Sequence, residues 1–172
     1  MTAIVAIRDG HRVWIGGDSA CSSDDTIEVQ RDAKVRKRGE IVLGTAGDGR
    51  WETALHFGVD IPRVIADLDK WVAIELTEAI RGYLKGTGET GDEKPDGDAL
   101  IGVRGRIYYL DSTLCTWKPL DPYGAVGSGS VAALSALDAG IRGTPKHRIK
   151  RALEIAEKRT PFVRRPFRIV ST

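Results

Sequence analysis

Residues 1–17, MTAIVAIRDGHRVWIGG, are the stretch that decides the fold. Residues 3–8 are a short apolar run of the kind that forms β-strands, and Asp9-Gly10 is a strong signal for a hairpin turn. Residues 11–17 then supply the return strand. The stretch therefore predicts an antiparallel pair of strands, the first of which begins directly after Thr2.

The rest of the chain repeats this pairing of strands and separates the pairs by helices. Strand-like runs on either side of short turns predict two more hairpins, at residues 34–44 and 99–110. Apolar residues that recur every three or four positions predict the helices. The expected helices cover residues 50–58, about 61–85, 131–141 and 145 to about 158, and a closing strand is expected at 167–171.

This order of elements indicates the fold class. Antiparallel hairpins with helices in sequence pairs between them are typical of two stacked sheets with helices outside. We therefore expect an α+β fold, a four-layer αββα sandwich of two antiparallel sheets flanked by helix pairs, in a single domain over residues 1–172. The polar stretch at residues 86–98 is expected to be a loop rather than a domain linker.

Composition and charge agree with an ordinary soluble domain. The 172 residues are 41% hydrophobic and 29% charged, which allows a substantial core. The net charge of +2 is too small to make nucleic acid an expected partner. Residues 144–172 nonetheless hold nine Lys and Arg against two Glu, a net of +7, which leaves −5 on the rest of the chain. Such a basic segment either docks an acidic partner or forms a solvated helix face.

Several classes of protein and site are not expected. No apolar run is long enough to span a membrane, and no signal peptide is present, so no membrane partner is expected. Cys21 and Cys115 are too few and too far apart in sequence for a disulfide framework or a zinc site, which fits a reduced, cytoplasmic setting. His11, His56 and His147 share no metal-ligand spacing, so no metal and no cofactor are expected.

Thr2 has the parts of a nucleophile. Methionine aminopeptidases cut before small residues, and removal of Met1 would give Thr2 a free α-amino group beside its own hydroxyl. A hydroxyl needs a base to take its proton. An α-amino group, with an ordinary pKa of about 7.7–8.0, is partly neutral at working pH. Many chains begin Met-Thr without using it, so other residues must decide.

Five stretches of the sequence, in a fixed order, favour a catalytic role for Thr2. They are Thr2–Val5, Gly16–Ser19, Asp32–Val35, Gly44–Gly49 and Gly127–Ser130. In order and spacing they resemble the proteasome β-subunit and HslV-type peptidases, members of the N-terminal nucleophile (Ntn) hydrolase class. The resemblance covers nearly the whole chain, and it implies the Ntn-hydrolase fold and a threonine-type peptidase.

The resemblance implies catalytic roles for Thr2, Asp18 and Lys34. The family places an Asp sixteen residues after the nucleophile and a Lys sixteen residues beyond that, which is where Asp18 and Lys34 stand relative to Thr2. Thr2 Oγ would attack the scissile carbonyl while its own amine relays the proton. Lys34 would place a positive charge beside that hydroxyl. Asp18 would keep Lys34 charged and oriented.

Two further groups are expected around this centre. Gly47 is the expected oxyanion donor, because a glycine lets the backbone approach a substrate closely and its N–H can stabilise the tetrahedral oxygen. Gly44 and Gly49 remain alternatives. Ser128 is expected to form a hydrogen bond near the Thr2 amine, as the family serine does, with Ser130 as the alternative; Ser130 is also a candidate N-cap of the following helix.

The specificity pocket and the proton relay are less well defined. Asp32, Arg36 and Thr45 stand where the family's specificity pocket would be, and their mixed charge leaves the cleavage preference open. The family usually carries an Asp shortly after the helix that corresponds to residues 152–156. Here no Asp follows Asp138, which leaves open how the amine is oriented.

The expected function is a threonine-type endopeptidase subunit of a self-compartmentalising, proteasome-like or HslV-like complex. The resemblance implies a stacked homo-oligomeric ring (a hexamer or a heptamer), a peptide or unfolded protein as substrate, and an AAA+ unfoldase as a possible partner. Two alternatives stay open. One is a small-molecule amidohydrolase on the same fold, and the other is a catalytically inactive structural ring subunit.

Overall fold

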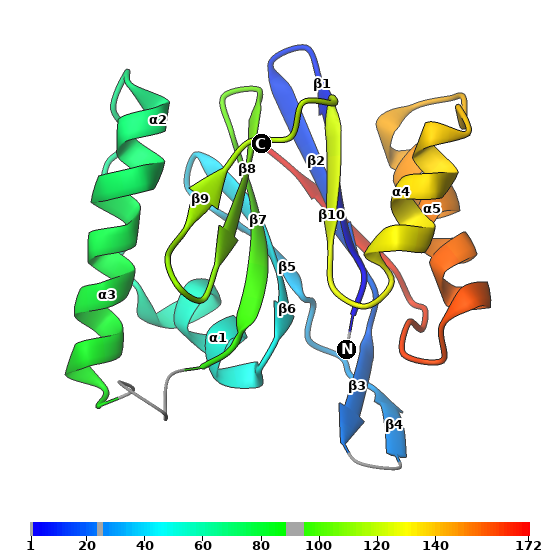
Figure 1. Cartoon of the computed structure of the whole chain (residues 1–172), viewed down its shortest axis with the longest axis horizontal. Coiled ribbons are helices and arrows are strands. Elements are labelled where there is room, and N and C mark those ends of the chain that lie inside the picture. Colours follow the sequence, from blue (N-terminus) through cyan, green and yellow to red (C-terminus); the bar gives the residue numbers. More distant parts are fainter. Residues whose placement is uncertain (1, 24–25, 89–94) are drawn as a thin grey trace.

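The layers of the molecule run from left to right in Figure 1: helices, a sheet, a second sheet, and helices again. The computed structural model describes residues 2–23, 26–88 and 95–172. The predicted αββα sandwich of antiparallel sheets is confirmed. Met1 and residues 89–94 of the expected polar loop lie outside the described residues.

Two sheets form the centre, and every strand pair in them is antiparallel. The four-stranded sheet has the order β10-β1-β2-β11, and the five-stranded sheet has the order β5-β6-β7-β8-β9. A separate two-stranded ribbon, β3-β4, lies beside the amino terminus (Figure 1). The strands are β1 (Ile4–Asp9), β2 (Arg12–Gly17), β3 (Ala20–Ser23), β4 (Thr26–Val29), β5 (Val35–Arg38), β6 (Ile41–Gly47), β7 (Gly97–Val103), β8 (Arg106–Asp111), β9 (Thr116–Trp117), β10 (Tyr123–Val126) and β11 (Arg168–Ser171).

The helices cover the outer faces of the two sheets (Figure 1). On the five-stranded side, two helical segments each contain a π-helical stretch, labelled η. On the other side, α4 and α5 pack against each other and on β1. The helical elements are α1 (Gly49–Thr53), η1 (Ala54–Gly58), α2 (Leu68–Lys70), η2 (Trp71–Leu76), α3 (Thr77–Gly86), α4 (Ser130–Asp138) and α5 (Pro145–Arg159).

β1 is buried on both faces, which explains its unbroken apolar sequence. Val5 and Ile7 belong to the core between the four-stranded sheet and helices α4 and α5. Ile4 and Ala6, which alternate with them, belong to the core between the two sheets. All four side chains have 0% exposure. Because both faces are covered, a strand at this position needs a continuous apolar run rather than an alternating one.

The predicted hairpins are confirmed, and their turns contain glycines that explain them. The turn between β1 and β2 has Gly10 at a φ of 57°, and that between β5 and β6 has Gly39 at 59°. Both values lie in the left-handed region, where glycine has no steric penalty. The hairpin of β7 and β8 and the closing strand β11 are also present.

The predicted helix at about 61–85 is wrong at its start. Regular helix begins at Leu68, where the Asp67 side chain accepts a hydrogen bond from the Lys70 N–H at 3.1 Å and so caps the first turn. The Ile65 carbonyl, which a longer helix would use internally, accepts instead from the Arg104 guanidinium at 3.2 Å. A hydrogen bond from a side chain in a distant hairpin therefore replaces the helical hydrogen bond that the apolar periodicity of residues 61–65 predicts.

Other elements were not predicted, or end elsewhere than predicted. The ribbon β3-β4 and the short strands β9 and β10 have no counterpart among the predicted elements, and α4 ends at Asp138 rather than at residue 141. Within residues 2–23, 26–88 and 95–172, no helix combines the length and the apolar character needed to cross a bilayer.

Candidate active site

Thr2, Lys34 and Asp18 meet at one end of the sandwich. The Lys34 ammonium donates hydrogen bonds to Thr2 Oγ1 at 2.7 Å and to Asp18 Oδ1 at 3.1 Å. All three residues are buried, with exposures of 3% for Thr2, 4% for Lys34 and 0% for Asp18. As predicted, the Lys34 side chain lies close to Thr2 and pairs with Asp18.

Strand pairing accounts for this meeting. Ile4 of β1 pairs with Gly17 of β2, so the residues just outside the pair, Thr2 and Asp18, come close together at the same end. Lys34 precedes β5 in the other sheet, and its carbonyl accepts a hydrogen bond from the Thr45 N–H at 3.0 Å, which fixes it to β6. The three side chains therefore come from the facing edges of two sheets.

Asp18 is saturated with hydrogen bonds. Its Oδ1 accepts from Lys34 and from the Ala3 N–H at 3.1 Å. Its Oδ2 accepts from the Ala20 N–H at 2.9 Å and from the Arg164 N–H at 3.2 Å. Four donors on two oxygens compensate the cost of burying a carboxylate.

Ser128 lies at the other side of Thr2. The Thr2 nitrogen donates to Ser128 Oγ at 3.2 Å, and the Gly129 N–H donates to the Thr2 carbonyl at 3.0 Å. Gly127 has a φ of 88°, and a Cβ added there would collide with the Thr2 carbonyl. The backbone of this turn therefore packs closely against Thr2. Ser130, the alternative, is the first residue of α4, and Gly129 rather than Ser130 is the N-cap.

The segment after α5 reaches the centre through its backbone. Here the family would be expected to supply an Asp. In this chain Arg164 donates its N–H to Asp18, and its carbonyl accepts from the Ser19 N–H at 2.8 Å. The Thr2 nitrogen has Ser128 as its hydrogen-bond partner among the described residues.

The three glycine candidates are in different environments. A Cβ at Gly44 would point into the core between the sheets, 2.5 Å from Ile4 Cγ2, and Gly44 does not line the pocket described next. Gly47 and Gly49 both line it. Gly47 has a φ of 126°, and a Cβ there would lie 2.5 Å from the Asp96 carbonyl oxygen. Packing against β7 therefore requires a glycine at residue 47 before any substrate is considered.

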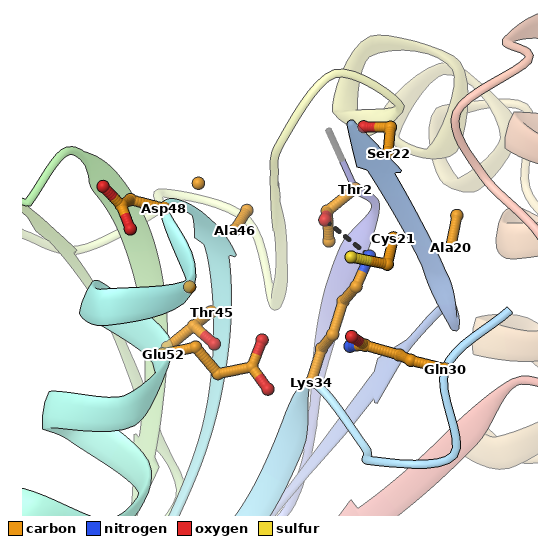
Figure 2. Close-up of a pocket in the computed structure, with 12 residues that line it drawn as sticks. Thr2, Ala20, Cys21, Ser22, Gln30, Lys34, Thr45, Ala46, Asp48 and Glu52 are labelled. Atoms are coloured by element: carbon orange, nitrogen blue, oxygen red, sulfur yellow. Dashed lines mark hydrogen bonds between the residues drawn. The ribbon is translucent and has the colours of Figure 1, made fainter. Parts of the chain in front are cut away.

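A pocket of about 250 Å³ opens beside Thr2 and Lys34 (Figure 2). Thr45, one of the three expected specificity residues, lines it. Asp32 is exposed and Arg36 lies with its guanidinium 4.0 Å from the centre of the Phe57 ring, and neither lines the pocket. The lining residues are Thr2, Ala20, Cys21, Ser22, Gln30, Lys34, Thr45, Ala46, Gly47, Asp48, Gly49 and Glu52.

Glu52 and Gln30 are lining residues that the sequence analysis did not single out. Glu52 lies one helical turn beyond Asp48, which ends the glycine-rich stretch and caps α1 by accepting from the Arg50 N–H at 2.8 Å. An acidic residue one turn into a helix that starts at the site was the available signal. Gln30 follows β4, which was not predicted, so no sequence signal pointed to it.

Two titratable side chains beside the pocket have shifted pKa values. Burial is the main cause that lowers the pKa of His56 to about 4, and the positive charges of Arg36 and Arg38 add to it. His56 is therefore neutral near pH 7, and its Nε2 lies 3.3 Å from Thr45 Oγ1. Burial also raises the pKa of Glu52. In the described ranges, no three His, Cys, Asp or Glu side chains gather closely enough to hold a metal ion.

No family model matches the chain. Solved structures match it over nearly its whole length. Thiobacillus denitrificans BPH in complex with epoxomicin is similar to it with a TM-score of 0.82 and 18% identity, covering 99% of this chain and 98% of that one. Eukaryotic HslV from Trypanosoma brucei has a TM-score of 0.78 and 19% identity, with the same coverage. The chain has the HslV fold.

A third structure extends the comparison. Anbu (ancestral beta-subunit) from Yersinia bercovieri has a TM-score of 0.69 and 16% identity, covering 99% of this chain and 81% of that one. The HslV fold is the Ntn-hydrolase sandwich that the resemblance implied, so the expected fold is confirmed. On this fold, the chain places the Thr2 hydroxyl within hydrogen-bond distance of the buried Lys34 ammonium.

Proposed function

We propose that this chain is a threonine-type endopeptidase subunit of a self-compartmentalising complex, a single domain over residues 1–172, with Thr2 as its N-terminal nucleophile after removal of Met1. The observation that carries the proposal is the 2.7 Å hydrogen bond from the buried Lys34 ammonium to Thr2 Oγ1. Burying an ammonium group costs desolvation free energy even when it is paired with a carboxylate, and an apolar residue would often stabilise the fold as well. The buried Lys34 therefore favours a functional role. The HslV fold supports the same function.

The proposed reaction begins at Thr2 Oγ1. The α-amine takes the hydroxyl proton as the oxygen attacks the scissile carbonyl, and it then gives that proton to the leaving amine. The peptide bond breaks and an ester to Thr2 forms, which water hydrolyses by the reverse relay. Lys34 stabilises negative charge that develops on Oγ1 and disfavours protonation of the nearby amine, while Asp18 holds Lys34 in place.

Gly47 and Ser128 have supporting roles in this proposal. The Gly47 N–H stabilises the tetrahedral oxygen, with the Gly49 N–H as the alternative from the same pocket wall. Ser128 accepts a hydrogen bond from the Thr2 nitrogen at 3.2 Å, and once Met1 is removed this contact orients the free amine that acts as the base. Ser128 then takes over the orienting role for which the family usually uses an additional Asp. Thr45 belongs to the pocket that receives a substrate side chain, and Asp32 and Arg36 act on that pocket only through their charge.

We further propose that the subunits form stacked homo-oligomeric rings, hexamers or heptamers, that enclose the Thr2 sites. Val131 on α4 is 75% exposed and Leu120 is fully exposed, so both apolar side chains are accessible to a neighbouring subunit. The HslV fold supports ring assembly. Peptides or unfolded proteins are the proposed substrates, and an AAA+ unfoldase is the proposed partner that delivers them.

Peptide hydrolysis tests the function. Purified protein is incubated with a panel of fluorogenic peptides, alone and with epoxomicin, the compound bound by one structural neighbour. We expect hydrolysis that epoxomicin inhibits and that Thr2→Ala abolishes with the fold and the assembly intact. Thr113→Ala, at an exposed threonine away from the pocket, is the matched control and should cleave normally. Ordinary turnover by Thr2→Ala would refute the proposal.

A small-molecule amidohydrolase is the second candidate, because a pocket of this size accommodates a small ligand as well as a single peptide side chain. About 250 Å³ is below the range of roughly 300–1,000 Å³ that is usual for drug-sized ligands. Light scattering separates the two enzymes, because a closed ring is required only for the compartmentalised peptidase. Intact mass separates both from an inactive structural subunit, since either enzyme requires loss of Met1.

A further inference from the structure

Glu52 presents its carboxylate to the pocket. The side chain comes from α1, is half-buried, and reaches into the space below Thr2 in Figure 2. Among the described residues it forms no hydrogen bond and no ion pair through its carboxylate, and burial raises its pKa. The two other carboxylates near Thr2 are engaged: Asp18 accepts from four donors, and Asp48 pairs with Arg50 at 2.9 Å.

The nearby cations do not neutralise Glu52. Lys34 lowers the pKa of Glu52, but its ammonium binds Thr2 and Asp18. Arg36 also lowers that pKa, from its place over the Phe57 ring. Asp18 and a further carboxylate, that of Asp32, raise it, and burial, which is the largest cause, leaves the pKa of Glu52 raised. The pocket is therefore short of one positive charge close to Glu52.

Gln30 faces Glu52 from the opposite wall. Figure 2 shows the two side chains extending toward one another across the lower part of the pocket, with the Lys34 stem between them. The hydroxyl of Thr45 lies on the Glu52 side. Carboxylate, amide and hydroxyl oxygens together form a set of acceptors, which suits a ligand group with several N–H donors.

We propose that this pocket selects peptides with Arg or Lys immediately before the cleaved bond, and that Glu52 is the residue that determines this preference. The inference rests on the proposed function, since it assumes that the scissile carbonyl lies at Thr2. A pocket of about 250 Å³ has room for one substrate side chain. Arg fits best, because its planar guanidinium binds a carboxylate through two parallel hydrogen bonds.

A structural role for Glu52 predicts different behaviour. An acidic residue in the first turn of α1 interacts favourably with the helix dipole whether or not a substrate binds. In that case, replacing Glu52 would alter the stability of the fold and leave the ranking of substrates unchanged. Substrate ranking, rather than overall activity, is therefore the quantity to measure.

The test compares peptides that differ only in the residue before the fluorophore: Arg, Lys, citrulline, Leu and Glu. Citrulline has the shape of Arg without its charge. We expect the kcat/KM ratio of the Arg peptide to the citrulline peptide to be about 10 to 100 in the wild-type protein, as for one charge-assisted pair. Glu52→Gln should reduce this ratio to within about twofold of one, whereas Glu78→Gln, on the exposed face of α3, should retain it.

The pH dependence of the wild-type protein gives a second readout that needs no variant. Protonation removes the charge of Glu52, so the Arg preference should decline as pH falls. Because burial raises the pKa of Glu52, the decline should begin at a higher pH than an exposed glutamate would give. A ratio near one in the wild-type protein, or a ratio that Glu52→Gln leaves unchanged, overturns the inference.

Binding separates failure of this inference from failure of the proposed function. If no peptide in the panel is cleaved, the proposed function fails. The affinities of Thr2→Ala protein for labelled Arg and citrulline peptides, measured by fluorescence anisotropy, then test Glu52 alone. At least tenfold tighter binding of the Arg peptide, lost on adding Glu52→Gln, supports the inference, and equal affinities contradict it.

Discussion

Asp18→Asn should destabilise the protein far more than its conservative chemistry suggests. Each carboxylate oxygen of Asp18 accepts two donors: Lys34 and the Ala3 N–H on Oδ1, and the N–H groups of Ala20 and Arg164 on Oδ2. An asparagine retains one oxygen and turns an NH₂ group toward the other pair of donors. Whichever way the amide is oriented, two hydrogen bonds are lost and replaced by opposed donors.

The magnitude follows from this count. Hydrogen bonds to a charged group contribute about 1.5–3 kcal/mol each, and removing one partner of a buried ion pair costs about 3–5 kcal/mol. The two costs overlap, because Lys34 contributes to both. We therefore expect Asp18→Asn to lower the free energy of unfolding by about 4–6 kcal/mol, a large part of the roughly 5–15 kcal/mol of an ordinary domain.

Urea unfolding followed by circular dichroism measures this loss. With a denaturant slope of about 2–3 kcal/mol per molar, the midpoint should fall by about 2 M. Asp48→Asn is the matched control, because the Asp48–Arg50 pair is largely exposed and such pairs contribute about 0–1 kcal/mol. A midpoint for Asp18→Asn within about 0.3 M of that control would show that the four hydrogen bonds to Asp18 do not stabilise the fold to this extent.

Three further substitutions test the roles of Lys34, His56 and Gly47. Lys34→Ala should reduce peptide hydrolysis by orders of magnitude, and Lys34→Arg should not restore it, because the larger guanidinium is not a compact point charge. Wild-type turnover by either variant, in the same peptide assay, contradicts the role of Lys34. The pKa of His56 is lowered to about 4 in the fold, so the stabilisation by neutral His56 is complete above about pH 6.5 and is lost as pH falls to about 4, by about 3 kcal/mol. The free energy of unfolding, measured between these pH values, should therefore depend less on pH for His56→Gln than for the wild-type protein. An identical pH dependence of the two proteins would argue against a buried neutral imidazole. Gly47→Ala should lower the free energy of unfolding by at least about 2 kcal/mol, since a Cβ at a φ of 126° would lie 2.5 Å from the Asp96 carbonyl oxygen; an unchanged melting temperature would be inconsistent with this contact.

Local signals explain why the sheets could be predicted. The apolar run of β1 and the Asp9-Gly10 turn fix the first hairpin by themselves, and the same holds for the turns at Gly39 and Gly105. Pairing of Ile4 with Gly17 then brings Thr2 and Asp18 together. The proximity of Lys34 came from the spacing of family motifs, since no local rule places two sheets face to face.

Tertiary contacts explain what could not be predicted. The helix at Leu68 starts late because a distant residue, Arg104, binds the Ile65 carbonyl, and periodicity carries no information on such a contact. Arg36 packs on Phe57 instead of lining the pocket, which depends on how β5 lies against η1. Glu52 was missed because the face that a five-residue helix turns to a pocket depends on its packing rather than on its pattern.

Labelling with an electrophilic peptide tests the proposed role of Thr2 as the amino-terminal nucleophile. A peptide vinyl sulfone, which alkylates a nucleophilic hydroxyl by adding it across the electrophilic double bond, is added to the purified protein. The modified residue is then located by intact mass and peptide mapping. We expect one label per chain, on a peptide that begins at Thr2, and no label on Thr2→Ala or after denaturation. A chain that retains Met1 and takes up no label while cleaving peptides, or a label on Cys21 alone, would contradict the claim.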